Sequence, residues 1–391
     1  MNKCSFRFEA VSSKLIESKI RSCKVKPPGV DDLDCRLLIP VAEIIAPAIC
    51  HIINLSLLCC VCPLKWKRAK IIPLMKDKRL PFSGPNCRPI SLLPILSKIM
   101  ETIIYEQIQY YFSTNDLFTE YQHAYRKGYS TSTALASMTD DWYTDIDDKM
   151  NIGAVMLDFS AAFDIINHNL LLNKLAGYGF EKPALSWIES YLSNRTQTVF
   201  FNGCYSNTKC VKYGVPQGSC LGPLLYSIFT NDAPLNLNAS KLIMYADDLT
   251  IYSSASSIKL LNITMERELQ CIIKWIESNE LVLNVKKTKC MVLGSKYALS
   301  PNPKLILSVK GTVIEQVNEI KLLGIVIDDK LTWEKHIDGI ITKMGRAIST
   351  ISRNAIFSNT SNKESCCSIS STFKHRLLSG NLGHSHINTI K

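Results

Sequence analysis

The chain has 391 residues, of which 46% are hydrophobic and 20% charged. This composition supports a large apolar core and excludes a mainly disordered protein, because disordered chains bury too little apolar surface to offset their conformational entropy. Lys and Arg outnumber Asp and Glu by 45 to 34, a net charge of +11, which suits a protein that contacts a phosphate backbone, although a solvated basic surface gives the same sum.

The fifteen cysteines are an odd number at irregular spacing, and the sequence opens without a secretory signal. We therefore expect reduced thiols and an intracellular protein, in the nucleus or the cytoplasm and not secreted. No cysteine group has the paired spacing of a tetrahedral zinc site. Cys220 has no histidine nearby in sequence and is expected to be a small packing residue.

The first long apolar segment is Leu37–Cys62, which follows a polar leader predicted at residues 1–23. It is long enough to cross a bilayer. However, Pro40, Glu43 and Pro47 lie inside it, and such residues are costly or disruptive in lipid. We therefore predict a buried helix here, and no membrane contact.

The next segment is strongly basic, and only Asp77 opposes its positive charge. Its seven cations are Lys65, Lys67, Arg68, Lys70, Lys76, Lys78 and Arg79. The segment is a candidate nucleic-acid surface.

Two acidic sites lie in apolar, β-rich runs further along the chain. AVMLDFS predicts a buried strand that ends near Asp158, at a strand-to-helix corner, with helical spacing from Phe163 onward. LIMYADDLTIY predicts strand, tight turn and strand, with Asp247 and Asp248 at the turn. Between the two sites, YGVPQGSCLGP predicts a glycine-rich loop that leads into a helix from about Leu221.

The last predicted elements are a strand in IKLLGIVIDDKLTW and a helix with apolar residues near Ile337, Ile341 and Ile348. After Asn354 the pattern dissolves into Ser, Asn and Thr. We expect residues 355–391 to be an irregular, disordered tail.

The two acidic sites point to one chemistry. An unpaired carboxylate in an apolar strand is costly, so a cation must compensate these charges, and Mg²⁺ prefers oxygen ligands of this kind. If the two strands are neighbours, Asp158, Asp247 and Asp248 can hold two ions about 3.5 to 4 Å apart, which suits nucleotidyl transfer. The alternative is a pair of exposed turn acids.

The order LDFSAAFD, YGVPQGSCLGPLLYSIFTND, YADD, NELVLNVKKTKCMVLGS and IKLLGIVIDDKLTW resembles motifs A to E of reverse transcriptases from non-LTR retrotransposons. Upstream, NCRPISLLPILSKIMETIIYEQI and TEYQHAYRKGYSTSTAL are similar to the fingers segments of that family. The resemblance runs from about Lys24 to about Arg353.

The resemblance implies an α+β fold, a right-hand polymerase with helical fingers, an antiparallel-sheet palm and a partial helical thumb. The implied boundaries are 24–150 for the fingers, 151–317 for the palm with motifs A to D, and 318–354 for motif E and the partial thumb. No segment resembles an endonuclease, so that activity is expected to be absent from this chain.

The resemblance also implies a metal site with two Mg²⁺ ions, for which Mn²⁺ can substitute. The implied ligands are four oxygen donors, the side chains of Asp158, Asp247 and Asp248 and the backbone carbonyl of Phe159. Lys287 is implied to protonate the leaving pyrophosphate, and Lys286 and Lys289 are its rivals for this role.

The implied nucleotide-binding residues are Lys76, Arg88, Phe159, Phe163 and Gln217. Lys76 and Arg88 would contact the triphosphate, unless they only form a solvated surface. Phe163 would exclude a ribose 2′-hydroxyl, unless its ring only packs in the core. Gln217 would contact the incoming nucleotide and the template base, unless its loop is an ordinary turn.

The implied template and primer contacts are Arg126, Lys127, Gly218, Leu323 and Gly324. The predicted reaction is addition of deoxynucleotides to a primer 3′-hydroxyl, and the implied partners are an RNA template, a DNA primer and deoxynucleoside triphosphates. Two alternatives stay open. One is an inactive remnant of a retroelement that binds nucleic acid, and the other is an RNA-templated RNA polymerase.

Overall fold

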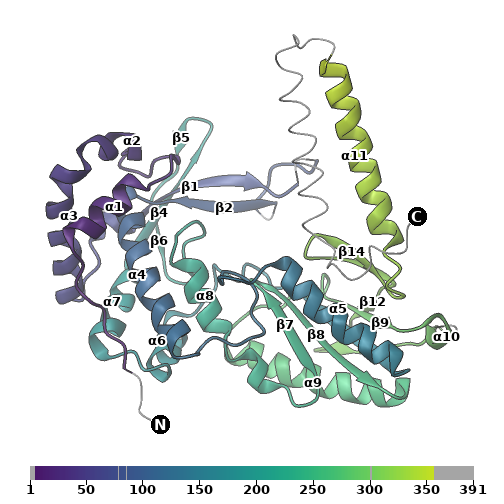
Figure 1. Cartoon of the computed structure of the whole chain (residues 1–391). Coiled ribbons are helices and arrows are strands. Elements are labelled where there is room, and N and C mark those ends of the chain that lie inside the picture. Colours follow the sequence, from purple (N-terminus) through teal and green to yellow (C-terminus); the bar gives the residue numbers. More distant parts are fainter. Residues whose placement is uncertain (1–4, 78, 85, 300–301, 356–391) are drawn as a thin grey trace. The chain divides into compact units, whose positions relative to one another are not determined.

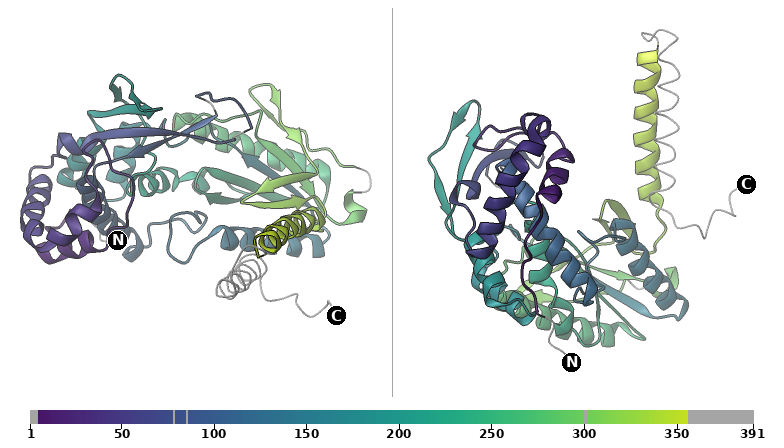
Figure 2. Two further views of the ribbon diagram at one scale, coloured as in Figure 1. Left: turned by 90° about the horizontal axis from the view of Figure 1, so that it is seen from above. Right: turned by 60° about the vertical axis from the view of Figure 1, so that its left-hand side comes forward.

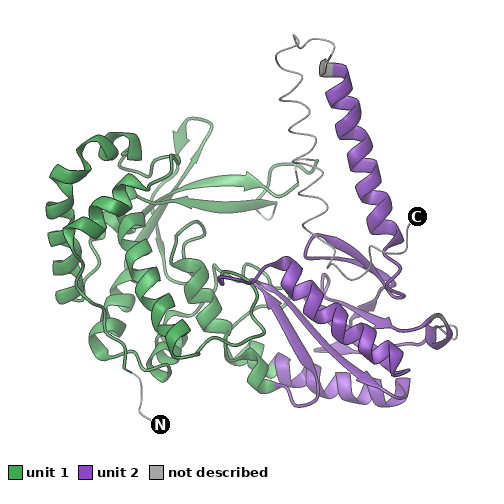
Figure 3. Cartoon of the chain, viewed as in Figure 1, with its two compact units in different colours: residues 1–125, 159–236, 274–283 green, residues 126–158, 237–273, 284–391 purple. Residues whose placement is uncertain are grey.

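The computed structural model of the protein describes residues 5–77, 79–84, 86–299 and 302–355. The chain forms two compact units, and each is built from segments that are far apart in sequence (Figure 3). Unit 1 contains residues 1–125, 159–236 and 274–283, and unit 2 contains residues 126–158, 237–273 and 284–391. The predicted tail, 355–391, lies outside the described residues except for Ala355.

Unit 1 combines helices with one mixed sheet. Its helices are α1 (Ser13–Arg21), α2 (Cys35–Leu38), η1 (Ile39–Val41), α3 (Ala42–Leu58), η2 (Leu64–Lys67), α4 (Ile95–Thr114), α6 (His168–Gly177), α7 (Lys182–Leu192), α8 (Gly222–Thr230) and η3 (Ala233–Asn236). Its strands are β1 (Arg68–Met75), β2 (Cys87–Leu92), β4 (Arg195–Phe201), β5 (Cys204–Tyr205) and β6 (Lys209–Val211). The strand order is β2-β1-β4-β5, and β6 also pairs with β4 (Figure 1).

The segment that raised the question of a membrane span is helical, but only one face of it is buried. α3 buries Ala42, Ala46, Ile49 and Ile53, which recur at helical spacing, while Ile44 on the other face is 80% exposed. Within the described residues, 35–58 is the one stretch whose helices are long and apolar enough to cross a membrane, and 28% of its most apolar window is buried in the protein. A helix was therefore predicted correctly, and its burial only in part.

Unit 2 is built on a second sheet with helices on both faces. Its helices are α5 (Thr131–Asp147), α9 (Ile258–Ser278, whose last residues belong to unit 1), α10 (Lys296–Leu299) and α11 (Glu334–Ala355). Its strands are β3 (Asn151–Leu157), β7 (Lys241–Tyr245), β8 (Asp248–Ala255), β9 (Lys289–Leu293), β10 (Ser308–Val309), β11 (Thr312–Val313), β12 (Glu315–Gln316), β13 (Glu319–Leu322) and β14 (Ile325–Asp328). The main sheet has the order β12-β9-β3-β8-β7 and is antiparallel except for the pairing of β12 with β9.

Alternation along β3 explains how this sheet is covered. Ile152, Ala154 and Met156 pack in the cluster that contains Trp142 of α5. A side chain at Gly153, on the opposite face, would meet Leu261 and Met265 of α9 at 3.2 to 3.3 Å. Both faces of β3 are thus buried by a helix, which is why its sequence is continuously apolar (Figures 1 and 2).

Several predicted elements agree with the structure, including the α+β class. The YADD hairpin consists of β7 and β8, and Ala246 in its two-residue turn has φ +56°. Helix α8 begins at Gly222, directly after the predicted loop. The strand predicted in IKLLGIVIDDKLTW is a hairpin, β13 and β14, that turns at Leu323 and Gly324.

The helix predicted directly after Asp158 was wrong in its start. Residues 160–165 form bends and turns, and helix α6 begins at His168. Asn167 caps it, since its side chain accepts from the backbone N–H groups of Asn169 and Leu170. Upstream of this cap, the carbonyls of Phe163 and Ile166 accept from the 214–215 backbone at 2.8 Å, so tertiary bonds replace helical ones.

A buried carboxylate fixes the turn that leads into β7. Glu268 of α9 is fully buried and accepts from the backbone N–H groups of Asn238, Ala239 and Ser240 at 2.7, 3.0 and 3.3 Å. Desolvation raises the pKa of Glu268, but these donors and Arg267 outweigh it, and the pKa is lowered overall. The start of the acidic hairpin is therefore tied to α9.

We predict that Glu268→Ala lowers the free energy of unfolding by about 3 kcal/mol at neutral pH, because three backbone N–H groups lose a buried carboxylate that accepts from all of them. The carboxylate contributes stability above its ordinary pKa of 4.5, and this contribution is lost as the pH falls through the lower folded-state pKa. Urea unfolding of both proteins near neutral pH and in acid measures the difference. Equal stabilities at neutral pH would contradict the assignment.

Candidate active site

The predicted carboxylates follow neighbouring strands of the unit 2 sheet. β3 ends at Leu157, which pairs with Leu249 of β8, and Asp158 is the next residue. Asp248 begins β8, and Asp247 lies in the turn between β7 and β8. The side chain of Asp158 is 39% exposed, and Asp247 and Asp248 are exposed. The register of one strand pair therefore brings all three acids to the same end of the sheet.

Asp158 is held by the segment that contains the predicted lysine. Its N–H donates to Thr288 Oγ1 at 3.4 Å, and its carbonyl accepts from the N–H of Asn284 at 2.7 Å. Lys287 Nζ lies 4.0 Å from Asp158 Oδ2. The rival Lys289 instead pairs with Glu315 at 2.6 Å. Of these two lysines, Lys287 is the one beside the carboxylate.

The donor set fits a hard divalent cation, because all three side chains offer carboxylate oxygens. Phe159, the next residue after Asp158, forms an isolated antiparallel β-bridge with Leu283. The backbone hydrogen bonds of this bridge are made by the residues on either side of the pair and not by the pair itself. The Phe159 carbonyl is not used by that bridge. Within the described ranges, no three His, Cys, Asp or Glu side chains are close enough to hold a metal ion, so the three carboxylates do not converge on one point.

In unit 1, the predicted glycine-rich loop fits closely against its neighbours. A side chain at Gly218, where φ is +112°, would lie 2.8 Å from the carbonyl oxygen of Ser91. At Gly214, where φ is +80°, it would lie 2.5 Å from the backbone of Asp164. The N–H of Ser91 also donates to the carbonyl of Gln217 at 2.7 Å. The loop is therefore fixed against β2 and the 159–167 segment, and both glycines are needed for the approach.

Gln217 is oriented by a carboxylate that the sequence analysis did not select. Its side-chain amide donates to both carboxylate oxygens of Asp164, at 2.9 and 2.8 Å. Partial desolvation raises the pKa of Asp164, while the Gln217 bond and the charge of Lys76 oppose the rise. The signal for Asp164 was present, since it is the second acid of LDFSAAFD.

The ring of Phe163 is half-buried and stacks on Tyr226 of α8, with centroids 4.5 Å apart and an interplanar angle of 24°. Tyr226 is 1% exposed. Phe163 thus packs on the core through one face, and it is not fully buried.

The structure also places the predicted cations of the fingers and of the template contacts. Arg88 is exposed on β2, opposite Leu74 of β1. The guanidinium of Arg126 lies 4.2 Å from the ring centroid of Tyr129, and Lys127 is exposed. Unit 1 contains Lys76, Arg88, Phe159, Phe163, Gln217 and Gly218, and unit 2 contains Asp158, Asp247, Asp248, Lys287, Arg126, Lys127, Leu323 and Gly324.

A second residue that was not predicted from the sequence holds the Gln217 loop by a hydrogen bond from the core. Glu101 of α4 is fully buried, and its carboxylate accepts from the N–H of Cys220 at 3.0 Å and from the Tyr191 hydroxyl at 2.9 Å. Burial raises the pKa of Glu101, and the buried Arg195 opposes this rise. No sequence pattern signals Glu101, because its partners lie 90 and 119 positions away.

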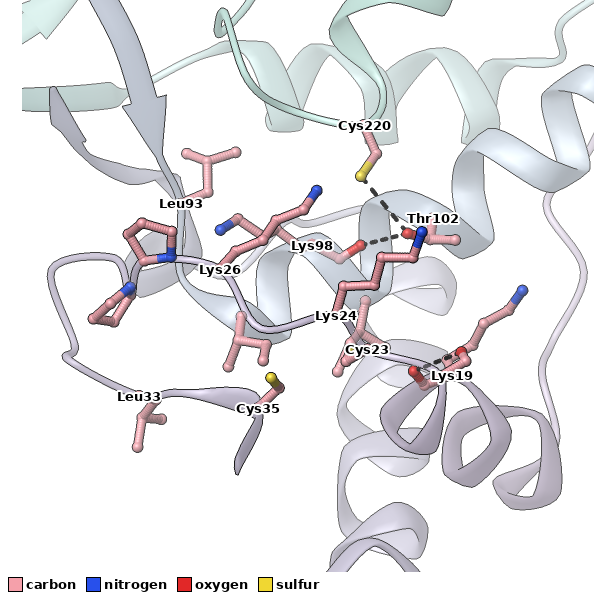
Figure 4. A pocket seen from close by; sticks show the side chains of 15 residues that line it. Lys19, Cys23, Lys24, Lys26, Leu33, Cys35, Leu93, Lys98, Thr102 and Cys220 are labelled. Carbon is pink, nitrogen blue, oxygen red and sulfur yellow. Dashed lines mark hydrogen bonds between the residues drawn. The ribbon is translucent and has the colours of Figure 1, made fainter. Parts of the chain in front are cut away.

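Beside Cys220, unit 1 has a cavity of about 280 Å³ (Figure 4). Lys19, Lys24, Lys26 and Lys98 are among its lining residues, and desolvation lowers the pKa of Lys98. Thr102 Oγ1 donates to Cys220 Sγ at 3.8 Å across its wall. None of the predicted site residues lines this cavity.

Unit 2 has acids at neighbouring strand ends, and unit 1 has a glycine-rich loop with an oriented glutamine. Each feature is of the kind expected in a nucleic-acid polymerase. The profile of the family "Reverse transcriptase (RNA-dependent DNA polymerase)" matches residues 78–327. The chain belongs to this family, and the predicted resemblance to non-LTR retrotransposon proteins is confirmed.

Two curated relatives come from Drosophila melanogaster. The chain is 32% identical over 323 residues to the probable RNA-directed DNA polymerase from transposon BS, covering 80% of this chain and 35% of that protein. It is 29% identical over 344 residues to the RNA-directed DNA polymerase from mobile element jockey, covering 86% of this chain and 37% of that protein. The chain thus spans about a third of the length of these relatives.

A solved structure of apo telomerase from Candida tropicalis, truncated from its C-terminal domain, aligns with 70% of this chain and 55% of its own. The TM-score is 0.44 and the identity 15%, too weak a likeness to bear on the fold.

We predict that Glu101→Leu destabilises the protein by about 3 to 5 kcal/mol, because it removes the negative charge that interacts with the buried Arg195 and leaves the Cys220 N–H without its acceptor. Glu101→Gln keeps an acceptor of nearly the same shape and should lose less than half as much. Urea unfolding of the two variants and the wild type measures these differences. Equal losses in both variants would contradict the role of the Cys220 hydrogen bond.

Proposed function

We propose that the chain is the polymerase part of a non-LTR retrotransposon protein, and that it adds deoxynucleotides to a primer 3′-hydroxyl on an RNA template. The observation that carries this proposal is the strand register that brings Asp158, Asp247 and Asp248 to one end of the unit 2 sheet, in a chain of the reverse transcriptase family. The right-hand division into fingers, palm and partial thumb belongs to the same proposal.

Asp158, Asp247, Asp248 and the carbonyl of Phe159 are the residues that would hold two Mg²⁺ ions. When bound, such ions lower the pKa of an attacking hydroxyl and neutralise a leaving phosphate. The carboxylates contribute negative charge in a partly exposed position, where ions and substrate can reach them.

Lys287 is the proposed proton donor to the leaving pyrophosphate. Its side chain is 68% exposed, so its ion pair with Asp158 contributes little to stability and can open. The Nζ ammonium can then donate a proton to a pyrophosphate that binds beside Asp158. General acid catalysis of this kind is typically worth about 10² to 10⁴ in rate.

Nucleotide selection is assigned to unit 1. Lys76 and Arg88 supply positive charge for the triphosphate, and Asp164 holds the Gln217 amide in a fixed orientation for the base pair being formed. Phe163, stacked on Tyr226, presents a rigid edge that would clash with a ribose 2′-hydroxyl but not with deoxyribose. This ring favours DNA synthesis over the alternative of an RNA-templated RNA polymerase.

We predict that Asp158→Asn or Asp247→Asn lowers single-turnover primer extension on an RNA template by at least about a thousandfold, which corresponds to about 4 kcal/mol of transition-state stabilisation. Primer-template binding should change little. Asp140→Asn, at an exposed position on α5, is the matched control and should extend normally.

Three outcomes would contradict the proposal. Extension that survives either substitution would remove the acids from the reaction. A folded wild-type chain that binds primer-template and extends with neither nucleotide type would favour the inactive remnant, and preferential use of ribonucleotides would favour the RNA polymerase.

A further inference from the structure

The mixed sheet of unit 1 is free of negative charge. None of its five strands contains Asp or Glu, and no acidic residue occurs between Glu189 and Asp232. The cations on these strands are Arg68, Lys70, Arg88, Arg195 and Lys209. A polyanion can therefore approach this sheet without repulsion from its own strands.

The two faces of the sheet differ in character. On one face, Ala69 and Ile71 of β1 pack with Leu93 and the partly buried Val199 of β4. Residues of the opposite parity point the other way, because side chains alternate along a strand. That second face carries Lys70, Phe200 and Tyr205, and we call these three residues the aromatic face.

Contacts within the aromatic face join aromatic rings to a cation. The rings of Phe200 and Tyr205 form a cross-strand pair with centroids 4.7 Å apart. Lys70 Nζ lies 4.5 Å from the centroid of Phe200 and 5.5 Å from that of Tyr205. Tyr205 is nevertheless 55% exposed. A solvent-exposed aromatic ring beside a lysine is a surface on which a nucleobase can stack.

The aromatic face is continuous with the nucleotide-selection residues of the same unit. Arg88 of β2 pairs with Leu74 of β1, and the side chain of Leu74 points to the same face as that of Lys70. Lys70 in turn pairs with Thr198 of β4, whose side chain points to the same face as that of Phe200. Arg88 and the aromatic face thus share one side of the sheet. β2 also bonds the Gln217 loop through Ser91. Neighbouring strands lie about 4.8 Å apart, so the sheet leads from the loop to Tyr205 in a few strand widths.

We propose that the aromatic face binds single-stranded RNA, the part of the template that has not yet been copied. The identity of this strand rests on the proposed function, and the stacking surface rests on the contacts above. Bases of a single strand expose their flat faces and can stack on Tyr205 and Phe200, while Lys70 is available to the adjacent phosphate. A duplex has its bases stacked internally and cannot use the rings in this way.

The test is binding of a short single-stranded RNA that contains 2-aminopurine, measured by fluorescence and anisotropy with the full chain carrying Asp247→Asn to prevent turnover. Tyr205→Leu should weaken this binding about tenfold, while leaving affinity for a blunt RNA–DNA duplex within about twofold. Tyr205→Trp, which keeps a stacking ring, should bind as the wild type does. Tyr110→Leu is the matched control, because Tyr110 is 72% exposed on α4 of the same unit.

Lys70→Gln should weaken single-strand binding and reduce its salt dependence by about one phosphate contact, whereas Tyr205→Leu should leave that slope unchanged. Equal affinities of the Tyr205→Leu and Tyr110→Leu variants would overturn the proposal, and so would an equal loss of duplex binding. If wild type extends primers while Tyr205→Leu binds RNA normally, only this inference fails. If Tyr205 is needed for RNA binding but wild type incorporates nothing, only the polymerase proposal fails.

Discussion

The antiparallel pairing of β3 with β8 is the constraint on which the candidate site depends. Leu157 pairs with Leu249, so Asp158 and the YADD turn emerge from neighbouring strands at one end of the sheet. A shift of one residue in this register would turn the apolar side chains of β3 away from their partners on α5 and α9. The packing that stabilises the sheet therefore also fixes the position of the acids, and the acids themselves contribute nothing to the core.

Unit 1 uses acidic side chains for a similar purpose. Glu101 and Asp164 each bond the Gln217 loop, Glu101 at Cys220 and Asp164 at the side chain of Gln217. Val215 and Leu221 of this loop are buried in the core, and the Gln217–Cys220 segment between them is held by such bonds. Burying the Glu101 carboxylate costs desolvation energy, and that cost is consistent with a loop that must keep one geometry.

The parts predicted correctly from sequence are those governed by local pattern. Alternation and the turn residues gave the β7–β8 hairpin, and the glycine-rich run gave the start of α8. The helix start after Asp158 was wrong because backbone bonds from residues 214 and 215 hold the 159–167 segment outside a helix, and helical spacing does not report such bonds. Glu101 was missed for the same reason, since its partners are distant in sequence. Asp164 lies inside a motif that the sequence shows, but its bond to Gln217 is seen only in the structure. The residues of the aromatic face are far apart in sequence, and only the strand pairing brings them together.

The central claim is that Asp158 and the YADD turn form one divalent-cation site. Iron-directed cleavage with added hydrogen peroxide and ascorbate tests this most directly, because Fe²⁺ bound in place of Mg²⁺ reduces the peroxide to hydroxyl radicals that cut the backbone beside it. If the site forms, cuts are expected near Asp158 and near Asp247 in the wild type, both suppressed by excess Mg²⁺ and both lost in Asp158→Asn. Cleavage near only one of these residues, or cleavage near Asp247 that survives Asp158→Asn, would contradict it.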